Sequence, residues 1–126
     1  MSTTMEVAKK LVDLCQQGKF NDAMNALYAD NIVSVEASAP PGKSPRMDGI
    51  AAVREKAAWW EANHEVHGCK VEGPWPHGDR FIVRFTLEVT AKAGPMAGKR
   101  FAMDETALYT VEDGKIVQEE FFYHMG

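Results

Sequence analysis

Three glutamates combine the residue type and the position that proton transfer requires. Glu36 lies near the end of a run of β-branched residues, and Glu105 and Glu119 lie in two later runs that alternate in character. A carboxyl group that is buried among apolar side chains, or beside a second carboxyl group, keeps its proton to a higher pH than usual. Such a group can act as a general acid or base near neutral pH. We therefore predict Glu36, Glu105 and Glu119 as catalytic residues, with Glu36 as the base.

The facing of Glu105 and Glu119 depends on the pairing of the last two runs. Asp113-Gly114 between these runs predicts a hairpin turn. A left-handed bulge at the glycine would set Ala107 opposite Glu119 and Glu105 opposite Phe121. We therefore expect the two glutamates to be diagonal neighbours on one face.

That face of the hairpin is the more apolar and aromatic one, so we assign it to the interior. Its members alternate along both strands: Met103, Glu105, Ala107, Tyr109, Val117, Glu119, Phe121 and Tyr123. An alternative interpretation leaves both acids solvated, either at an open end of the interior or, after a slip of one residue, on the outer face.

Side chains that could contact a small ligand accompany the acids. We predict these contacts from six residues: Trp60, His67, Met103, Tyr109, Phe121 and Tyr123. The alternative for the aromatic members is ordinary core packing, and ligand contact requires a cavity. The run from His64 to His67 is one residue too short for the HExxH zinc motif, and in a strand the two histidines point to opposite faces. We expect no metal site and no cofactor.

The first half of the sequence predicts helices that support these residues. Thr3 with Glu6 forms a capping box, and apolar residues then recur at helical spacing until Gly18. A second, shorter helix follows from Phe20 to Leu27, and a strand over 32–37 comes next. The segment 38–47 contains three prolines and is expected to be a loop. Asp48 is expected to cap a third helix with an apolar stripe: Ile50, Val53, Ala57 and Trp60.

The second half alternates with the period of strands. The expected strands cover 64–73, 81–90, 100–111 and 115–124. Three helices with one early strand, followed by these strands, predict an α+β fold. We expect one domain over residues 1–126, with the helices packed on a strongly curved, mainly antiparallel sheet that forms a cone, a cystatin-like α+β roll.

Composition excludes several classes of partner. The chain has 126 residues and a formal charge of -4, and its basic residues are scattered, so nucleic acid and membrane surfaces are not expected partners. No apolar run is long enough to span a bilayer, and no signal peptide is recognisable. Cys15 and Cys69 lack a CxxC arrangement and are expected to be reduced thiols of a cytoplasmic protein.

Three short motifs, in their order and spacing, resemble SnoaL-like proteins of the nuclear transport factor 2 and ketosteroid isomerase superfamily. These are Tyr28-Ala29-Asp30-Asn31, Asp48-Gly49-Ile50 and Val111-Glu112-Asp113-Gly114-Lys115-Ile116-Val117. The resemblance covers nearly the whole chain. It implies a cone whose concave face holds a small apolar ligand, and a homodimer formed through the outer face of the sheet. The scaffold hosts isomerases, cyclases, hydrolases, dehydratases and proteins without chemistry.

The resemblance also relates single residues to known sites. Glu36 resembles the catalytic aspartate base of ketosteroid isomerases, a worked case of an aspartate base with a tyrosine and a neutral aspartic acid as its oxyanion hole. Leu11 and Ala107 stand where that tyrosine and that aspartic acid would be. In SnoaL-type cyclases the last strand resembles GKIVEHWD, whereas Phe121 stands here in place of its final acid. Neither familiar catalytic set is expected.

Three functions remain open from the sequence. The first is an acid–base enzyme of the isomerase, cyclase, dehydratase or hydrolase type, acting on an apolar cyclic or polyketide-like substrate. The second is a non-catalytic ligand-binding or dimerisation module. The third is a domain that binds a protein partner through a polar outer sheet face, where Arg84, Glu88, Asp104, Glu120 and His124 are expected.

Overall fold

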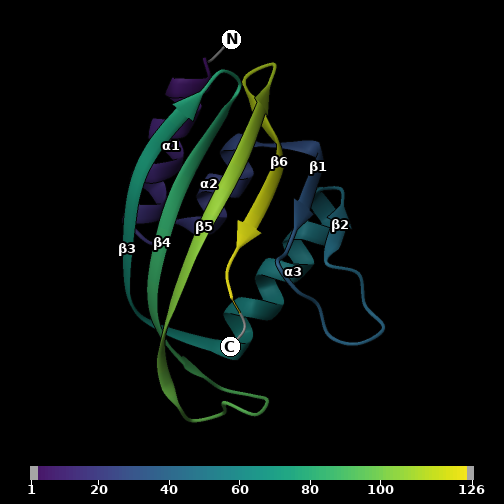
Figure 1. The fold of residues 1–126 in the computed structure, drawn as a ribbon, viewed down its shortest axis with the longest axis vertical. Coiled ribbons are helices and arrows are strands. Elements are labelled where there is room, and N and C mark those ends of the chain that lie inside the picture. Colours follow the sequence, from purple (N-terminus) through teal and green to yellow (C-terminus); the bar gives the residue numbers. More distant parts are fainter. Residues whose placement is uncertain (1–2, 125–126) are drawn as a thin grey trace.

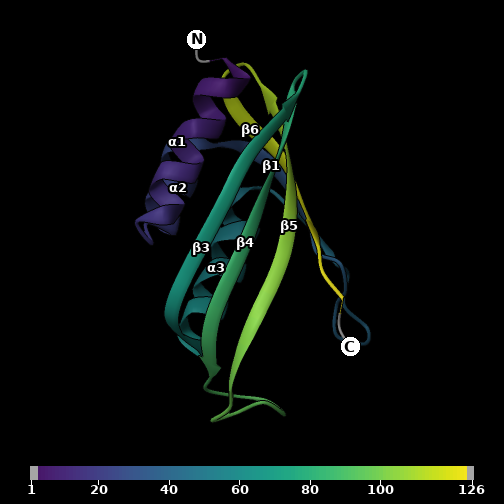
Figure 2. The same ribbon diagram turned by 60° about the vertical axis from the view of Figure 1, so that its left-hand side comes forward.

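Three helices pack on one face of a curved sheet of six strands (Figures 1 and 2). This computed structural model describes residues 3–124. The helices are α1 (Thr4–Gln16), α2 (Phe20–Leu27) and α3 (Ile50–Asn63). The strands are β1 (Tyr28–Val35), β2 (Arg46–Asp48), β3 (His64–His77), β4 (Arg80–Ala91), β5 (Arg100–Glu112) and β6 (Lys115–Phe122). None of the helices combines the length and apolar character needed to cross a membrane. The predicted α+β fold is confirmed.

The sheet is antiparallel except where β1 runs parallel to β6. Its strands are ordered β2-β1-β6-β5-β4-β3. Along β4, odd-numbered residues from Phe81 to Val89 are buried, whereas the even-numbered residues between them face away from the helices. The buried side chains meet the apolar stripe of α1, which includes Val7 and Leu11.

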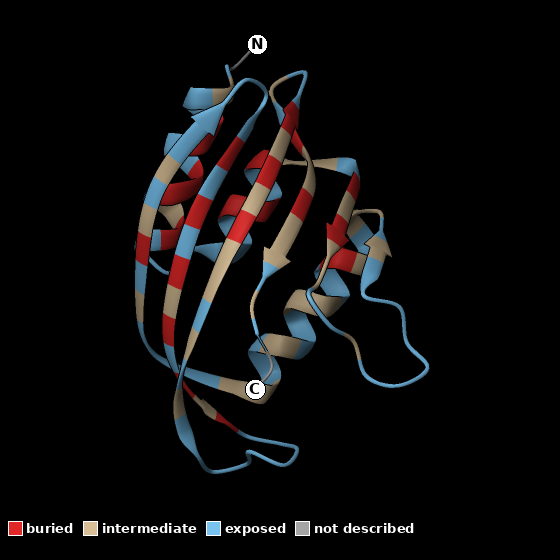
Figure 3. Ribbon diagram, viewed as in Figure 1, coloured by how far each residue is buried: buried red, intermediate tan, exposed pale blue. Residues whose placement is uncertain are grey.

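Burial is uneven along the length of the sheet. Buried positions gather in α1, α2 and the strand segments against them, whereas α3 is exposed or partly exposed apart from Val53 (Figure 3). The half of the sheet under α1 and α2 therefore forms the core. The half under α3 leaves side chains partly exposed on the inner face.

The start of α1 agrees with its sequence signal. Thr3 and Glu6 form the predicted capping box, in which each side chain accepts a hydrogen bond from the backbone N–H of the other residue. Two neighbouring predictions are wrong. Asp48 does not cap α3, because Gly49 occupies the N-cap and the Asp48 carboxylate pairs with Arg46 instead. The expected loop 38–47 contains the beginning of β2, which pairs with the end of β1.

The predicted pairing of the last hairpin is also wrong. Asp113 and Gly114 both have positive φ, of 52° and 76°, and Glu112 pairs directly with Lys115. This is a two-residue turn of the primed kind rather than a turn with a bulge at the glycine. The bulge occurs further along β6, at Val117, where the pairing shifts by one residue.

The two differences change the neighbours of each acid but not their facing. Tyr109 lies opposite Glu119, and Ala107 lies opposite Phe121. Because strand side chains alternate with period two, a total shift of two residues keeps each side chain on its predicted face. The Ala107–Phe121 pair now separates Glu105 from Glu119, so the two acids are not diagonal neighbours.

Candidate functional site

A lysine of α3 lies at the centre of the polar groups on the inner face. The Lys56 ammonium lies 3.1 Å from Glu36 Oε1 and 3.9 Å from Glu119 Oε1. It donates a hydrogen bond of 2.6 Å to Ser34 Oγ and lies 4.9 Å from the centre of the Phe121 ring. Elements far apart in the sequence, α3, β1 and β6, therefore meet at one cationic group.

Glu119 is the buried end of this cluster. Only 2% of the residue is exposed, and its carboxylate accepts hydrogen bonds from Tyr28 Oη and, at 3.0 Å, from Ser34 Oγ. Burial raises the pKa of Glu119 above its usual value, and the Lys56 ammonium is the largest effect in the opposite direction. Burial also raises the pKa of Tyr28 well above its usual value, so its hydroxyl is a donor. The oxygens of Glu119 are thus engaged by the protein itself.

Glu36 is the accessible end of the cluster. It directly follows β1, and its backbone N–H donates to the Pro45 carbonyl oxygen in the segment that leads to β2. Its side chain is 25% exposed, against 21% for Lys56. Tyr123, just beyond β6, donates a long hydrogen bond of 3.4 Å to Glu36 Oε2. Glu36 is therefore held by one cation and remains open to water on one side.

Glu105 is a carboxyl group of a different kind. It lies on the inner face of β5 opposite Phe85, is partly exposed, and makes no side-chain hydrogen bond to any residue of the described range. Its pKa is raised from 4.5 to about 7, mainly by burial and next by the negative charge of Glu36, whereas the Lys56 ammonium opposes the rise. At neutral pH the Glu105 carboxyl is therefore present both with and without its proton.

The residues predicted to contact a ligand fall into three groups. Met103, Phe121 and Tyr123 are partly exposed near the acids, and Phe121 lies below the Lys56 ammonium. Tyr109 is buried and stacked on the core residue Phe81, with ring centres 5.0 Å apart.

Two further predicted contacts lie away from the acids. Trp60 lies one turn along α3 from Lys56 and stacks on His64, with ring centres 4.5 Å apart. His67 is exposed and bonds Thr90, which faces away from the helices, so His67 belongs to the outer face. A bulge in β3 between Val66 and Gly68 accounts for this facing.

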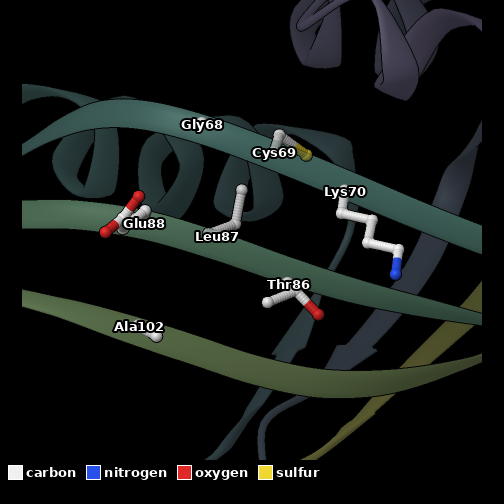
Figure 4. Close-up of a pocket in the computed structure, with 7 residues that line it drawn as sticks. All are labelled: Gly68, Cys69, Lys70, Thr86, Leu87, Glu88 and Ala102. Atoms are coloured by element: carbon white, nitrogen blue, oxygen red, sulfur yellow. The ribbon is translucent and has the colours of Figure 1, made fainter.

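Two hollows formed by described residues lie on the outer face of the sheet. One, of about 320 Å³, lies over β3, β4 and β5, with the helices behind the strands in this view (Figure 4). The other, of about 220 Å³, lies beside Trp75, Ile82 and Leu108. Neither contains an acid of the inner cluster. Over residues 3–124, no group of three or more His, Cys, Asp or Glu residues is arranged to hold a metal ion.

The sequence interpretation missed Lys56, Ser34 and Tyr28. Lys56 carried a recognisable signal, because it lies three residues after Val53 and four before Trp60, on the apolar stripe of α3. A charged residue on such a stripe requires a partner. Ser34 is two residues after the buried Ile32 in β1 and therefore faces inward. Tyr28 gave no such signal, since its contact with Glu119 depends on the parallel pairing of β1 and β6.

Comparison with known proteins identifies relatives of the chain. Residues 2–123 match the family model described as SnoaL-like domain. A protein from Mesorhizobium loti, described as a candidate SnoaL-like polyketide cyclase and also labelled carbohydrate phosphatase, is 45% identical to this chain. The match covers 97% of this chain and 100% of that one, with a TM-score of 0.89. Comparison with curated proteins returned no match.

More distant solved structures have the same fold. An NTF2-like protein of unknown function from Burkholderia pseudomallei has a TM-score of 0.74 at 18% identity, with 98% of this chain and 92% of that chain covered. A protein of unknown function with a cystatin-like fold from Xanthomonas campestris has a TM-score of 0.69 at 20% identity, with 96% and 90% covered. These two similarities concern the fold alone.

Proposed function

The chain belongs to the SnoaL-like domain family, and we propose that it catalyses proton transfer on a small apolar substrate by acid–base chemistry of its own side chains. The observation that carries this proposal is Glu105. Its side chain is partly exposed, has no hydrogen-bond partner in the described range, and has a pKa raised to about 7. A carboxyl group with such a pKa both donates and accepts protons at neutral pH.

The three acids have different roles in this proposal. Glu36 is the base, because its carboxylate forms an ion pair with Lys56 and is partly exposed. Glu105 is the acid that supplies or receives a second proton. Glu119 supports the site, since its oxygens are engaged by Tyr28 and Ser34. Removal of the Glu119 carboxylate would therefore change the environment of Lys56 rather than a contact with the substrate.

Charge and lining favour a neutral substrate. Three carboxyl groups face one ammonium, so a phosphorylated or carboxylated ligand would meet a surplus of negative charge. Met103 and Phe121 offer apolar contact beside the acids. A cyclic or polyketide-like compound fits this combination, in agreement with the description of the Mesorhizobium loti relative.

Hydrogen–deuterium exchange of an apolar ketone tests the proposal without the natural substrate. With 2-tetralone in D₂O, we expect the protein to accelerate exchange at the carbon atoms beside the carbonyl, as followed by proton NMR. Glu36→Gln should slow the catalysed exchange by about a hundredfold, the usual contribution of a general base. Glu105→Gln should slow it less and should remove its pH dependence near 7. Equal exchange with wild type and the Glu36→Gln/Glu105→Gln double variant would contradict the proposal.

A non-catalytic binding module is the second candidate. It is favoured by the engagement of Glu119 and Lys56 in contacts within the protein, which stabilise the inner face without any ligand. In that case 2-tetralone would bind without exchange.

We also propose that two copies pair through the outer face of the sheet. This face exposes three large apolar side chains: Trp75 (52%), Ile82 (38%) and Phe122 (51%). One of the two hollows is lined by Trp75 and Ile82, and the other lies on the same face over β3, β4 and β5. Burial of such side chains in a symmetric interface would remove apolar surface from water.

A further inference from the structure

Lys56 contacts a candidate base, and its side chain is partly exposed. An ammonium group has three N–H donors. In the described residues one of them bonds Ser34 Oγ at 2.6 Å, and Glu36 is the ion-pair partner at 3.1 Å. Glu119 at 3.9 Å lies beyond hydrogen-bond distance. The ammonium can therefore donate to one further oxygen atom, and its side chain is 21% exposed.

Within residues 3–124, no other cationic group forms an ion pair with the acids of the inner face. Arg46, Arg84 and Arg100 pair with other acids at exposed positions. The residues that match the isomerase oxyanion hole, Leu11 and Ala107, are both buried and apolar. Among the described residues, Lys56 is thus the cationic group available to stabilise negative charge that develops on a substrate beside Glu36.

We infer that Lys56 is a catalytic electrophile that stabilises an enolate, and that the substrate is an enolisable carbonyl compound. This inference rests on the proposed proton transfer by Glu36. The carbonyl oxygen accepts a hydrogen bond from the Lys56 ammonium, which places the adjacent C–H group near the Glu36 carboxylate.

The charges balance in each half of the reaction. The C–H bond beside the carbonyl breaks, and its proton forms an O–H bond on Glu36. The electron pair of that bond forms a C=C bond, and the carbonyl π pair moves to oxygen. The negative charge that leaves Glu36 therefore appears on the enolate oxygen, and the ammonium keeps one anionic neighbour throughout. Return of a proton to a carbon atom, from Glu36 or Glu105, completes the reaction.

The exchange of ion-pair partners predicts an unusual effect of Glu36→Gln. A glutamine is neutral, as Glu36 is after it has taken the proton, so the variant removes the nearer of the two carboxylates beside the ammonium. The probe is 4-nitrophenol, whose phenolate resembles an enolate and is followed by its visible absorbance. We expect Glu36→Gln to bind the phenolate about tenfold more tightly than wild type, or more. Addition of Lys56→Gln to this variant should abolish the gain.

Two controls make the test specific. Asp48→Asn also removes a carboxylate from an ion pair, that with Arg46, and should leave phenolate binding unchanged. Lys56→Met replaces Lys56→Gln if circular dichroism shows that the glutamine variant is unfolded. The inference is overturned if Glu36→Gln does not bind the phenolate more tightly, or if the gain persists without the ammonium. Glu36-dependent exchange of 2-tetralone together with either result would leave the proposed function standing and remove the role of Lys56.

Discussion

At the scale of residues, the site is a set of acids made unequal by their partners. Glu119 is enclosed by hydroxyl donors, Glu36 is paired with Lys56, and Glu105 has no partner among residues 3–124. Residue types in the sequence identified the acids, because glutamates on apolar strand faces are conspicuous. Their partners were not identified, because the contacts join α3, β1 and β6 across the sheet. Such unequal environments are what the proposed pairing of a base with an acid in one site requires.

Glu105→Gln should change the pH dependence of stability. The pKa of Glu105 is raised in the folded state, from 4.5 to about 7, so the proton stabilises the folded state fully below 4.5. That stabilisation is lost as the pH rises through about 7. At about 1.4 kcal/mol per pKa unit, the variant should gain roughly 3 kcal/mol over wild type between pH 4 and pH 8. Urea unfolding at several pH values measures this difference, and a constant difference would disagree with it.

Tyr28→Phe should destabilise the folded protein. The change removes the hydroxyl that donates to the buried Glu119 carboxylate, and loss of a donor to a buried acceptor costs about 1–3 kcal/mol. Tyr123→Phe is the matched control, because its hydrogen bond to the accessible Glu36 is 3.4 Å long. The control should change the free energy of unfolding by less than about 0.5 kcal/mol. Equal effects of the two changes in chemical denaturation would refute the role given to Tyr28.

At the scale of elements, local signals predicted the order of helices and strands but not every boundary. The capping box of α1 and the alternation along β4 depend on nearby residues, and both were recognisable. The β6 bulge and the short strand β2 depend on pairing with distant strands, and both were missed. Glu119 faces as predicted because two one-residue differences in pairing add up to a shift of two residues, so the sequence alone did not determine its neighbours.

The hairpin turn that sets this pairing can be tested at Gly114. Its φ of 76° lies in the left-handed region, where a Cβ atom costs about 1–2 kcal/mol. Gly114→Ala should therefore lower the free energy of unfolding by about that amount. In Gly68→Ala, an added Cβ would meet no atom within 4 Å and no positive φ is involved, so this matched change in β3 should cost less. A larger cost at Gly68 than at Gly114 would argue against the turn described.

At the scale of the whole molecule, α1 and α2 bury the inner face of one half of the sheet, whereas the half under α3 keeps partly exposed side chains (Figure 3). The family and the curved α+β architecture could be inferred from the sequence, because they depend on the order of elements and on short motifs. The two hollows on the outer face could not, since they depend on how side chains of three neighbouring strands combine. The inner face carries the acids, and the outer face carries exposed apolar side chains.

Phe122→Arg should convert a dimer into a monomer if the outer face forms the interface. The side chain is 51% exposed on β6, and an arginine there would place two like charges near each other in a symmetric contact. Light scattering after size-exclusion chromatography measures the mass. Trp59→Arg is the control, because Trp59 is 63% exposed on α3 rather than on the sheet, and it should leave the mass unchanged. A wild-type monomer would remove the dimer proposal altogether.

The central claim is that the inner face holds a carboxyl group that exchanges its proton at neutral pH. Carbon-13 NMR of protein labelled at the glutamate carboxyl groups, with Glu105→Gln to assign the resonance, measures this directly. We predict a titration midpoint for Glu105 near 7 in wild type. A midpoint near the ordinary value of 4.5 would contradict the account, because Glu105 would then be fully ionised at neutral pH and could not supply a proton.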